Sequence, residues 1–376
     1  MTDKTYHVII AGSGGIGSAT ALLLQQGLIQ TEVYLGDASL DAAQAAAAWV
    51  EAGFDHPVRV HAFEMPLEGT SAIFDQYLAQ ADILLDCLPG SEAPRMARLA
   101  KQHGLHYANV TEYVKETDEI MALGQGIEQG FILQTGLAPG FINVLGMQLF
   151  QQFCHTFGVE KADTVKMRVG ALTDEIVAPH YYGFTWSKVG VATEYLKPAI
   201  VVRSFEKTER PSLTDLEILK VNGVDYEEAL TSGGVSDLPD ALAGRVRHLD
   251  YKTLRHPGHY QWVINAIESE NLHTPDQLQS YMEEHIPDFE DDFVVIYASV
   301  EGEDSTGTPQ KLEKAYHIKP SQVGKHTLRA IQSTTAAGLA ESARMLLEGH
   351  VKGPILQSDV NPDTFMQGPF VSEIYI

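Results

Sequence analysis

Cysteine is scarce in this chain of 376 residues, which contains only Cys87 and Cys154. Two cysteines cannot form a disulfide framework, and these two lack the spacing of a metal site. Both lie in apolar stretches, where a small buried residue is a simpler interpretation than a nucleophile. The 15 histidines and the acidic residues are also scattered without ligand spacing, so we predict no metal site.

Basic residues are outnumbered almost two to one. Lys and Arg number 26 against 50 Asp and Glu, which gives a formal net charge of -24 at pH 7. Such a surface repels phosphate backbones and anionic lipids, so we expect neither nucleic acid nor membrane as a partner. No apolar run approaches the length of a membrane span, and the first six residues lack the features of a signal peptide. We therefore expect a cytoplasmic protein.

The opening segment predicts a dinucleotide-binding turn. An apolar run at 7–11, typical of a buried parallel strand, leads directly into Gly12-Ser-Gly-Gly-Ile-Gly17 and a helical stretch at 18–26. In such a turn the first glycine permits the tight bend, the second lets the backbone approach a pyrophosphate, and the third lets the helix pack on the strand. The helix N-terminus offers free N–H groups to the phosphates. The candidate cofactor-binding residues here are Gly12, Gly14, Gly15, Ile16 and Gly17.

A carboxylate follows the second predicted strand. That strand covers 32–36, and Asp37 follows it, about twenty residues after the last glycine of the turn. At this place a carboxylate holds ribose hydroxyls and repels a 2′-phosphate, which favours NAD while leaving NADP possible. Asp37 could instead be an ordinary turn residue.

Strands and helices continue to alternate as far as residue 140, which predicts a doubly wound parallel sheet. The ends of its fourth, fifth and sixth strands should border the crevice where a dinucleotide lies. The further cofactor-binding candidates at these ends are Cys87, Leu88, Pro89, Thr111, Gly136 and Pro139.

The pattern changes near residue 160, and the chain is longer than one hydrophobic core normally holds. Longer alternating strands predict an α+β domain with a mainly antiparallel sheet; they cover 164–172, 199–205, 292–301 and 311–319. A long helix at 328–347 should pack back on the first domain. The predicted fold class is α/β: a Rossmann domain at 1–140, an α+β substrate and dimerisation domain at 141–325, and a C-terminal helix and tail at 326–376. We also expect a homodimer, although no specific motif in the sequence indicates one.

Four segments stand out together. They are Gly12–Gly17, Thr135-Gly-Leu-Ala-Pro-Gly140, Thr185-Trp-Ser187 followed by Glu194-Tyr195 and Pro198, and Tyr251-Lys-Thr-Leu-Arg-His-Pro-Gly-His259. These patterns resemble the saccharopine dehydrogenase-like family, in particular its saccharopine reductase and lysine 6-dehydrogenase branch. The first segment is shared by many families, whereas the third and fourth are far more specific. The stretches 174–182 and 361–376 depart from the family pattern, which bears on the substrate more than on the fold.

The resemblance implies an NAD(P)-dependent oxidoreductase that acts on the C–N bond of an amino acid or related amine acid by hydride transfer through an imine. Such chemistry needs a held nicotinamide, a cation for the substrate carboxylate and an acid/base for the amine proton. We predict Arg255 for the carboxylate, Lys252 as a second cation or general base, and His259 for proton transfer. Trp186 and Ser187 are predicted to line the substrate pocket with Arg255.

Other interpretations of the same residues stay open. His259 could cap a turn at the surface, and Trp186 could be a core residue at a domain boundary. An enzyme of the carboxynorspermidine dehydrogenase type would act on a carboxylated polyamine, which an acidic surface would suit. A regulatory protein that binds a dinucleotide without catalysis would retain the glycine turn and show no turnover.

Overall fold

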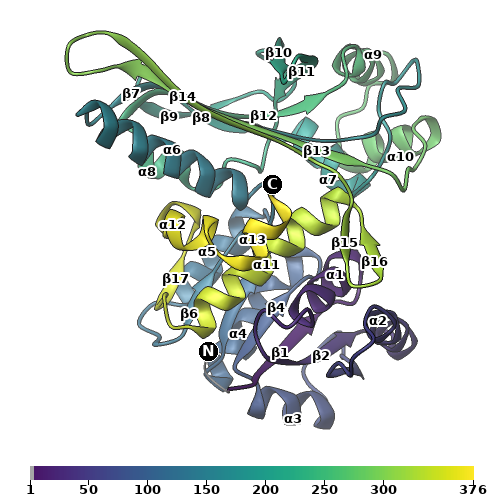
Figure 1. Ribbon diagram of the computed structural model, residues 1–376. Helices are drawn as coiled ribbons and strands as arrows, with labels where there is room; N and C mark the ends of the chain where they lie inside the picture. The colour runs from purple at the N-terminus through teal and green to yellow at the C-terminus, as the bar shows by residue number, and fades with distance from the viewer. Residues whose placement is uncertain (1–3) are drawn as a thin grey trace. The chain divides into compact units, whose positions relative to one another are not determined.

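The computed structural model describes residues 4–376, so the first three of the six residues considered for a signal peptide lie outside the described residues. The chain forms two compact units (Figure 1). Unit 1 contains 4–141, 321–328 and 332–375, and unit 2 contains 142–320, 329–331 and 376. The predicted boundaries at 140 and 325 lie close to the ends of the long segment of unit 2. Residues 326–376 return to unit 1, apart from 329–331 and 376.

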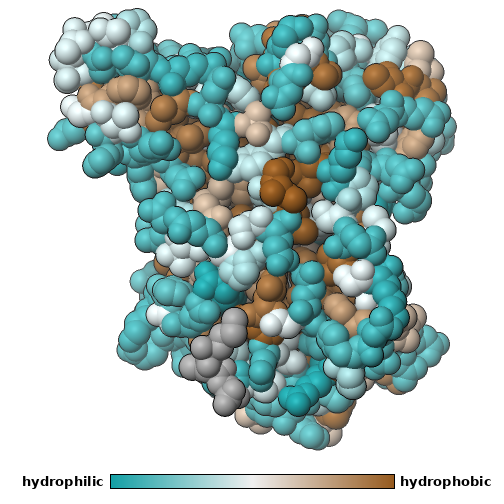
Figure 2. Space-filling view, viewed as in Figure 1, coloured by the Kyte–Doolittle hydropathy of each residue, from teal (hydrophilic) through white to brown (hydrophobic). Residues whose placement is uncertain are grey.

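The surface agrees with the composition. The face shown in Figure 2 is mostly hydrophilic, as expected for a chain with 20% charged residues. Within residues 4–376, no helix combines the length and the hydropathy needed to cross a bilayer.

Unit 1 is built on seven parallel strands in the order β17-β6-β5-β4-β1-β2-β3. The chain moves outward from β1 in both directions, so the carboxyl ends of β1 and β4 flank the crevice where such sheets bind ligands. The predicted Rossmann fold is confirmed. The strands are β1 (Tyr6–Ala11), β2 (Thr31–Asp37), β3 (Val60–Glu64), β4 (Ile83–Asp86), β5 (His106–Asn109), β6 (Gly130–Ile132) and β17 (Gly353–Ile355).

Helices cover this sheet. On one face, α3, α4 and α5 bury Phe74, Met96 and Ile120 against the strands. The helix α11 packs on β6, where Leu346 lies against Gly130. The helices of unit 1 are α1 (Gly15–Leu24), α2 (Leu40–Ala52), α3 (Ala72–Gln80), α4 (Ala93–His103), α5 (Val114–Leu123), α11 (Ala330–Leu347, its first two residues in unit 2), α12 (Pro362–Met366) and α13 (Pro369–Ile374), with 3-10 turns η1 (Gly90–Glu92) and η2 (Gln357–Asp359).

The C-terminal tail is more ordered than predicted, because it carries α12 and α13. Glu341 of α11 is fully buried and accepts a hydrogen bond from Phe370 N at 3.0 Å. Tyr375 Oη donates to Thr334 O at 2.7 Å. Proline at the first helical position of both short helices is the sequence signal for them.

Unit 2 is built on an eight-stranded sheet in the order β10-β11-β12-β7-β13-β14, with β8 paired to both β12 and β9. All pairs are antiparallel except β12 with β7, so the predicted mainly antiparallel sheet is confirmed. The strands are β7 (Ala162–Leu172), β8 (Ala199–Arg203), β9 (Glu206–Arg210), β10 (Glu217–Val221), β11 (Val224–Leu230), β12 (Val246–Arg255), β13 (Phe293–Glu303) and β14 (Pro309–Ile318). A separate hairpin, β15 (Ser321–Val323) and β16 (His326–Leu328), belongs to unit 1.

Three helices of unit 2 pack together and position the two specific sequence segments. Val191 of α7, Val263 of α9 and Met282 of α10 are fully buried in one hydrophobic cluster. Through this cluster, residues 185–198 meet the segment that ends β12 and begins α9. The helices of unit 2 are α6 (Phe141–Phe157, which begins at the boundary), α7 (Lys188–Leu196), α8 (Leu238–Leu242), α9 (His259–Glu270) and α10 (Pro275–His285).

Candidate functional site

The glycine turn joins β1 to α1 and leaves room for a phosphate. Gly12 has a φ of +97°, and a Cβ at Gly17 would lie 1.9 Å from the Gly12 carbonyl oxygen. Gly14 is the N-cap of α1 and provides no side-chain cap, and nothing lies within 4 Å of where its Cβ would be. Gly15 and Ile16 form the first turn of α1, whose free N–H groups can bind an anion. A pyrophosphate therefore fits this cradle.

Asp37 is the last residue of β2 and reaches back to the glycine turn. Its Oδ2 accepts hydrogen bonds from Ser13 N at 3.0 Å and Ser13 Oγ at 2.8 Å, and its Oδ1 accepts one from Ser39 N at 3.1 Å. Partial burial raises the pKa of Asp37, but these hydrogen bonds outweigh it, so the pKa lies below its ordinary value. The carboxylate is ionised at neutral pH and suits ribose hydroxyls. Ser13 is not among the predicted residues, because nothing local shows its contact with β2.

The loop after β4 carries Cys87, Leu88 and Pro89 beside the glycine turn. Cys87 N donates to Ala11 O at 2.8 Å, and a Cβ at Gly12 would lie 3.0 Å from Cys87 O. The backbone of this loop therefore runs along the turn that would hold the phosphates. The buried Asp86 and Tyr107 next to the loop are absent from the predicted set.

Thr111, Gly136 and Pro139 lie at the carboxyl ends of β5 and β6. Thr111 is half-buried, and its Oγ1 accepts a hydrogen bond from Tyr113 N at 3.3 Å. Gly136 N donates to Pro139 O at 3.0 Å, and both residues are buried. This turn packs against α11, since a Cβ at Gly338 would lie 2.6 Å from Gly136 O. All three residues lie at the expected edge of the sheet, although Gly136 and Pro139 are enclosed within the unit.

A buried polar cluster in unit 2 surrounds Arg255, whose side chain is 1% exposed. Its Nε donates to Tyr195 Oη at 2.7 Å, its Nη2 to Glu194 Oε1 at 2.9 Å and its Nη1 to Leu254 O at 3.0 Å. The guanidinium also lies 4.6 Å from the centre of the Tyr182 ring. The Nε–Nη2 edge of the guanidinium, which could bind a carboxylate with two hydrogen bonds, is thus occupied by Tyr195 and Glu194, and the burial of the side chain shields the rest of the group from solvent.

His259 begins α9 and is fully buried in the same cluster, not on a surface turn. Its Nδ1 lies 2.7 Å from His180 O, and because a carbonyl only accepts, Nδ1 carries the proton. Burial, followed by the charge of Arg255, lowers the pKa of His259 well below its ordinary value. The imidazole is therefore neutral, and its Nε2 accepts a hydrogen bond from Tyr195 Oη at 3.0 Å. The structure links Arg255, Tyr195 and His259 in one chain of hydrogen bonds.

Lys252 does not join this cluster, because successive residues of a strand alternate between faces and Lys252 lies on the other face of β12 from Arg255. Its ammonium contacts Glu228 Oε1 at 2.9 Å, Glu217 Oε2 at 3.1 Å and Asp215 O at 2.5 Å. These three acceptors match its three N–H groups. Lys252 is therefore part of a buried ion-pair network and is not placed to serve as the predicted second cation beside Arg255.

Trp186 and Ser187 lie at the start of α7. Ser187 is the N-cap of this helix, and its Oγ accepts a hydrogen bond from Gly190 N at 3.1 Å. Trp186 packs over Gly190 and against the hydrophobic cluster of α7, α9 and α10. These contacts fix the start of the helix that carries Glu194 and Tyr195, so both predicted residues support the Arg255 cluster from a distance.

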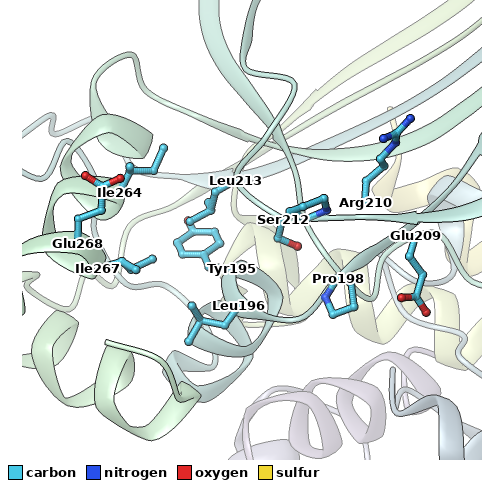
Figure 3. A pocket seen from close by; sticks show the side chains of 11 residues that line it. Tyr195, Leu196, Pro198, Glu209, Arg210, Ser212, Leu213, Ile264, Ile267 and Glu268 are labelled. Carbon is cyan, nitrogen blue, oxygen red and sulfur yellow. The ribbon is translucent and has the colours of Figure 1, made fainter. Parts of the chain in front are cut away.

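A groove of about 610 Å³ opens beside Tyr195 (Figure 3). The Tyr195 ring lines the groove while its hydroxyl binds Arg255 and His259, so the tyrosine connects the groove with the buried cluster. The groove is mostly apolar and carries charged side chains at its edges; its lining is Tyr195, Leu196, Pro198, Glu209, Arg210, Pro211, Ser212, Leu213, Ile264, Ile267 and Glu268. It is absent from the predictions because these residues come from separate parts of the sequence.

Two family models match the chain in succession. Residues 8–132 match the saccharopine dehydrogenase NADP binding domain, and residues 136–375 match the saccharopine dehydrogenase C-terminal domain. The second match alone covers more than half of the chain.

Solved structures with the same fold include two enzymes. Saccharopine dehydrogenase (L-Glu forming) from Saccharomyces cerevisiae is 16% identical, with a TM-score of 0.75 and 96% of each chain covered. Homospermidine synthase from Legionella pneumophila, solved in complex with NAD, is 14% identical, with a TM-score of 0.65 over 98% of this chain and 90% of that chain. At these identities the likeness shows the fold alone, and the branch within the family stays a prediction. From the two family models, this protein belongs to the saccharopine dehydrogenase family and has its NAD(P)-binding oxidoreductase fold.

Proposed function

We propose that this protein is an NAD(P)-dependent oxidoreductase that acts on the C–N bond of an amino acid or related amine acid, through an imine of the substrate. The observation that carries the proposal is the open phosphate cradle at Gly14, in a chain whose two halves both match saccharopine dehydrogenase domains. When bound, the dinucleotide would supply or accept the hydride. The free N–H groups of α1 would bind its phosphates, and Asp37 its ribose hydroxyls.

On the substrate side, the proposal assigns proton handling to Tyr195 and His259. The Tyr195 hydroxyl already donates a hydrogen bond to Nε2 of the neutral imidazole. Because the pKa of His259 lies well below its ordinary value, a proton that reached Nε2 would be passed on readily. Arg255 would act through Tyr195, whose hydroxyl it holds, because its Nε–Nη2 edge is occupied and its side chain is buried. This revises the predicted direct grip on a substrate carboxylate. Lys252 has no part in the proposed reaction.

We propose NAD as the cofactor. Support comes from the ionised Asp37 carboxylate, held beside the glycine turn by Ser13, because it would repel a 2′-phosphate. The test compares the Kd of NADH and NADPH by fluorescence titration for the natural protein and for Asp37→Ser. We expect the natural protein to prefer NADH and the variant to lose most of that preference. A natural protein that binds NADPH more tightly would refute the assignment.

The activity test uses the purified protein with NAD or NADP and a panel of lysine, saccharopine and related amino acids, in both reaction directions. Absorbance of the reduced cofactor reports turnover. A Tyr195→Phe variant should lose most of the kcat while binding cofactor normally, because the ring remains and only the hydroxyl is lost. Absence of turnover across the whole panel would reject the amino-acid proposal.

A second candidate substrate is a carboxylated polyamine. It is supported by the shared fold with homospermidine synthase and by the acidic composition of the chain. Carboxylated and plain polyamines therefore belong in the same panel, and turnover of these alone would favour this candidate. Tight cofactor binding with no turnover of any amine would instead indicate a regulatory protein.

A further inference from the structure

A buried carboxylate lies beneath the loop that follows β4. Asp86 is the last residue of β4 and is 3% exposed. Within residues 4–376 no Lys, Arg or His side chain is at ion-pair distance from it. Two donors bind it instead: Leu88 N reaches Oδ1 at 3.0 Å, and Tyr107 Oη reaches Oδ2 at 2.8 Å. Burying a carboxylate without a cation costs free energy, so its presence calls for a reason beyond packing.

The hydrogen bonds continue across the neighbouring strand ends. Asn109 Nδ2 donates to Tyr107 Oη at 3.2 Å. Asn109 in turn accepts from Gln134 N at 2.9 Å through its side chain and from Thr135 N at 2.8 Å through its carbonyl. The network therefore joins the carboxyl ends of β4, β5 and β6, which form half of the edge where a dinucleotide lies.

The strand order indicates which half of the dinucleotide this is. Asp37 ends β2, on the side of β1 where an acidic residue binds the adenosine ribose. The other nucleotide of the cofactor then lies over β4, β5 and β6, on the opposite side of the crevice. The loop Cys87–Gly90 begins at the end of β4, so it would border the nicotinamide half.

We infer that Asp86 and Tyr107 are positioning residues for the nicotinamide half of the dinucleotide. Asp86 holds Leu88 N and thereby fixes the path of the loop that borders the cofactor. Tyr107 holds Asp86 and ties it to β5. The inference rests on the cofactor binding in the proposed function and adds two residues that act through the loop without touching the reacting atoms.

The experiment measures the Kd of NADH and of ADP for the natural protein and for Asp86→Ala. ADP probes only the adenosine half, at the glycine turn and Asp37. Without the carboxylate, the loop samples other conformations. If the population of the conformation that binds the cofactor falls to about a tenth, the apparent Kd of NADH rises about tenfold. We expect that rise for NADH and an ADP affinity within about twofold of the natural protein.

Conservative variants separate positioning from general loosening. In Asp86→Asn the amide oxygen can accept from Leu88 N while Nδ2 donates to Tyr107 Oη, so NADH affinity should recover to within about threefold. Tyr107→Phe should weaken NADH binding and leave ADP binding unchanged. The control is Tyr34→Phe, since Tyr34 is a buried tyrosine of the same sheet whose hydroxyl contacts His7 and Glu32; its NADH affinity should not change.

The outcomes distinguish this inference from the proposed function. If Asp86→Ala binds NADH as tightly as the natural protein, or loses NADH and ADP affinity equally, the positioning role is refuted while cofactor binding stands. Failure of Asp86→Asn to recover affinity would also refute the role as stated. A natural protein that binds neither NADH nor NADPH would overturn the proposed function, and this inference with it.

Discussion

Replacing Asp86 by Asn should stabilise unit 1 at neutral pH, and the gain should vanish in acid. Burial raises the pKa of Asp86 from 3.8 to about 6, and the negative charge of Glu92 adds to this rise. The hydrogen bonds from Leu88 and Tyr107 and the positive charge of Arg95 lower the pKa, but by less. The folded protein therefore binds this proton more tightly than the unfolded chain. The stabilisation that comes from protonated Asp86 is fully present below pH 3.8 and is lost as the pH rises through about 6.

The size of the effect follows from the shift. The difference between 6 and 3.8 is 2.2 pH units. At about 1.4 kcal/mol per unit, the buried charge costs on the order of 3 kcal/mol above pH 6. Asparagine carries no charge and can keep both hydrogen bonds. The free energy of unfolding of Asp86→Asn should exceed that of the natural protein by up to about 3 kcal/mol at pH 7.5 and by only about 0.5 kcal/mol near pH 4.

Urea unfolding at several pH values provides the assay. Trp49, in α2, reports on unit 1 once Trp186 and Trp262 of unit 2 are replaced by phenylalanine in every protein compared. Asp118→Asn, at an exposed position of α5, is the matched control and should show no comparable trend with pH. A difference between Asp86→Asn and its parent that stays constant with pH would refute the reasoning.

Three other perturbations test separate parts of the structure. Gly17→Ala should lower the thermal midpoint strongly, because its Cβ would lie 1.9 Å from a backbone oxygen. Gly14→Ala should keep the thermal midpoint and lose dinucleotide affinity, because nothing lies within 4 Å of its Cβ position. Unchanged affinity of Gly14→Ala would contradict the phosphate cradle. Lys252→Met should destabilise unit 2 by roughly 2 kcal/mol, because the buried Glu228 loses one charged hydrogen bond but keeps its ion pair with Arg168. An unaltered urea midpoint would show that Lys252 contributes little to the network. If the homodimer expected from the sequence forms through the edge strand β10, where Ile218 is 60% exposed, Ile218→Lys should convert it into a monomer in light scattering. A monomeric natural protein would refute the dimer, and a dimeric Ile218→Lys variant would refute this interface.

The cofactor half of the molecule is predictable because its signals are local. A strand, a glycine turn and a helix follow one another within residues 6–24, and Asp37 ends the next strand. Asp86 escapes prediction because an aspartate at the end of an apolar strand suggests a turn. Its burial depends on Tyr107, which is 21 residues away on another strand.

In unit 2 the sequence indicates the right segments and leaves their arrangement open. Arg255 and His259 lie together, but their link, Tyr195, comes from a helix about sixty residues earlier in the chain. Lys252 belongs to the same short motif yet faces the opposite side of β12, as strand alternation requires. Their catalytic roles stay predictions until the variants are measured.

The order of the segments along the chain has a consequence for biosynthesis. β17 is the last strand made, and it completes the Rossmann sheet by pairing with β6, while the Gln357 side chain donates to Leu133 O at 2.7 Å. All of 142–320 leaves the ribosome before β17 does, so unit 2 can assemble its own sheet while the outer edge of β6 is still bare. A nascent chain that stops before residue 353 would therefore expose an unpaired parallel strand to other chains, and aggregation is the expected fate of such truncated products.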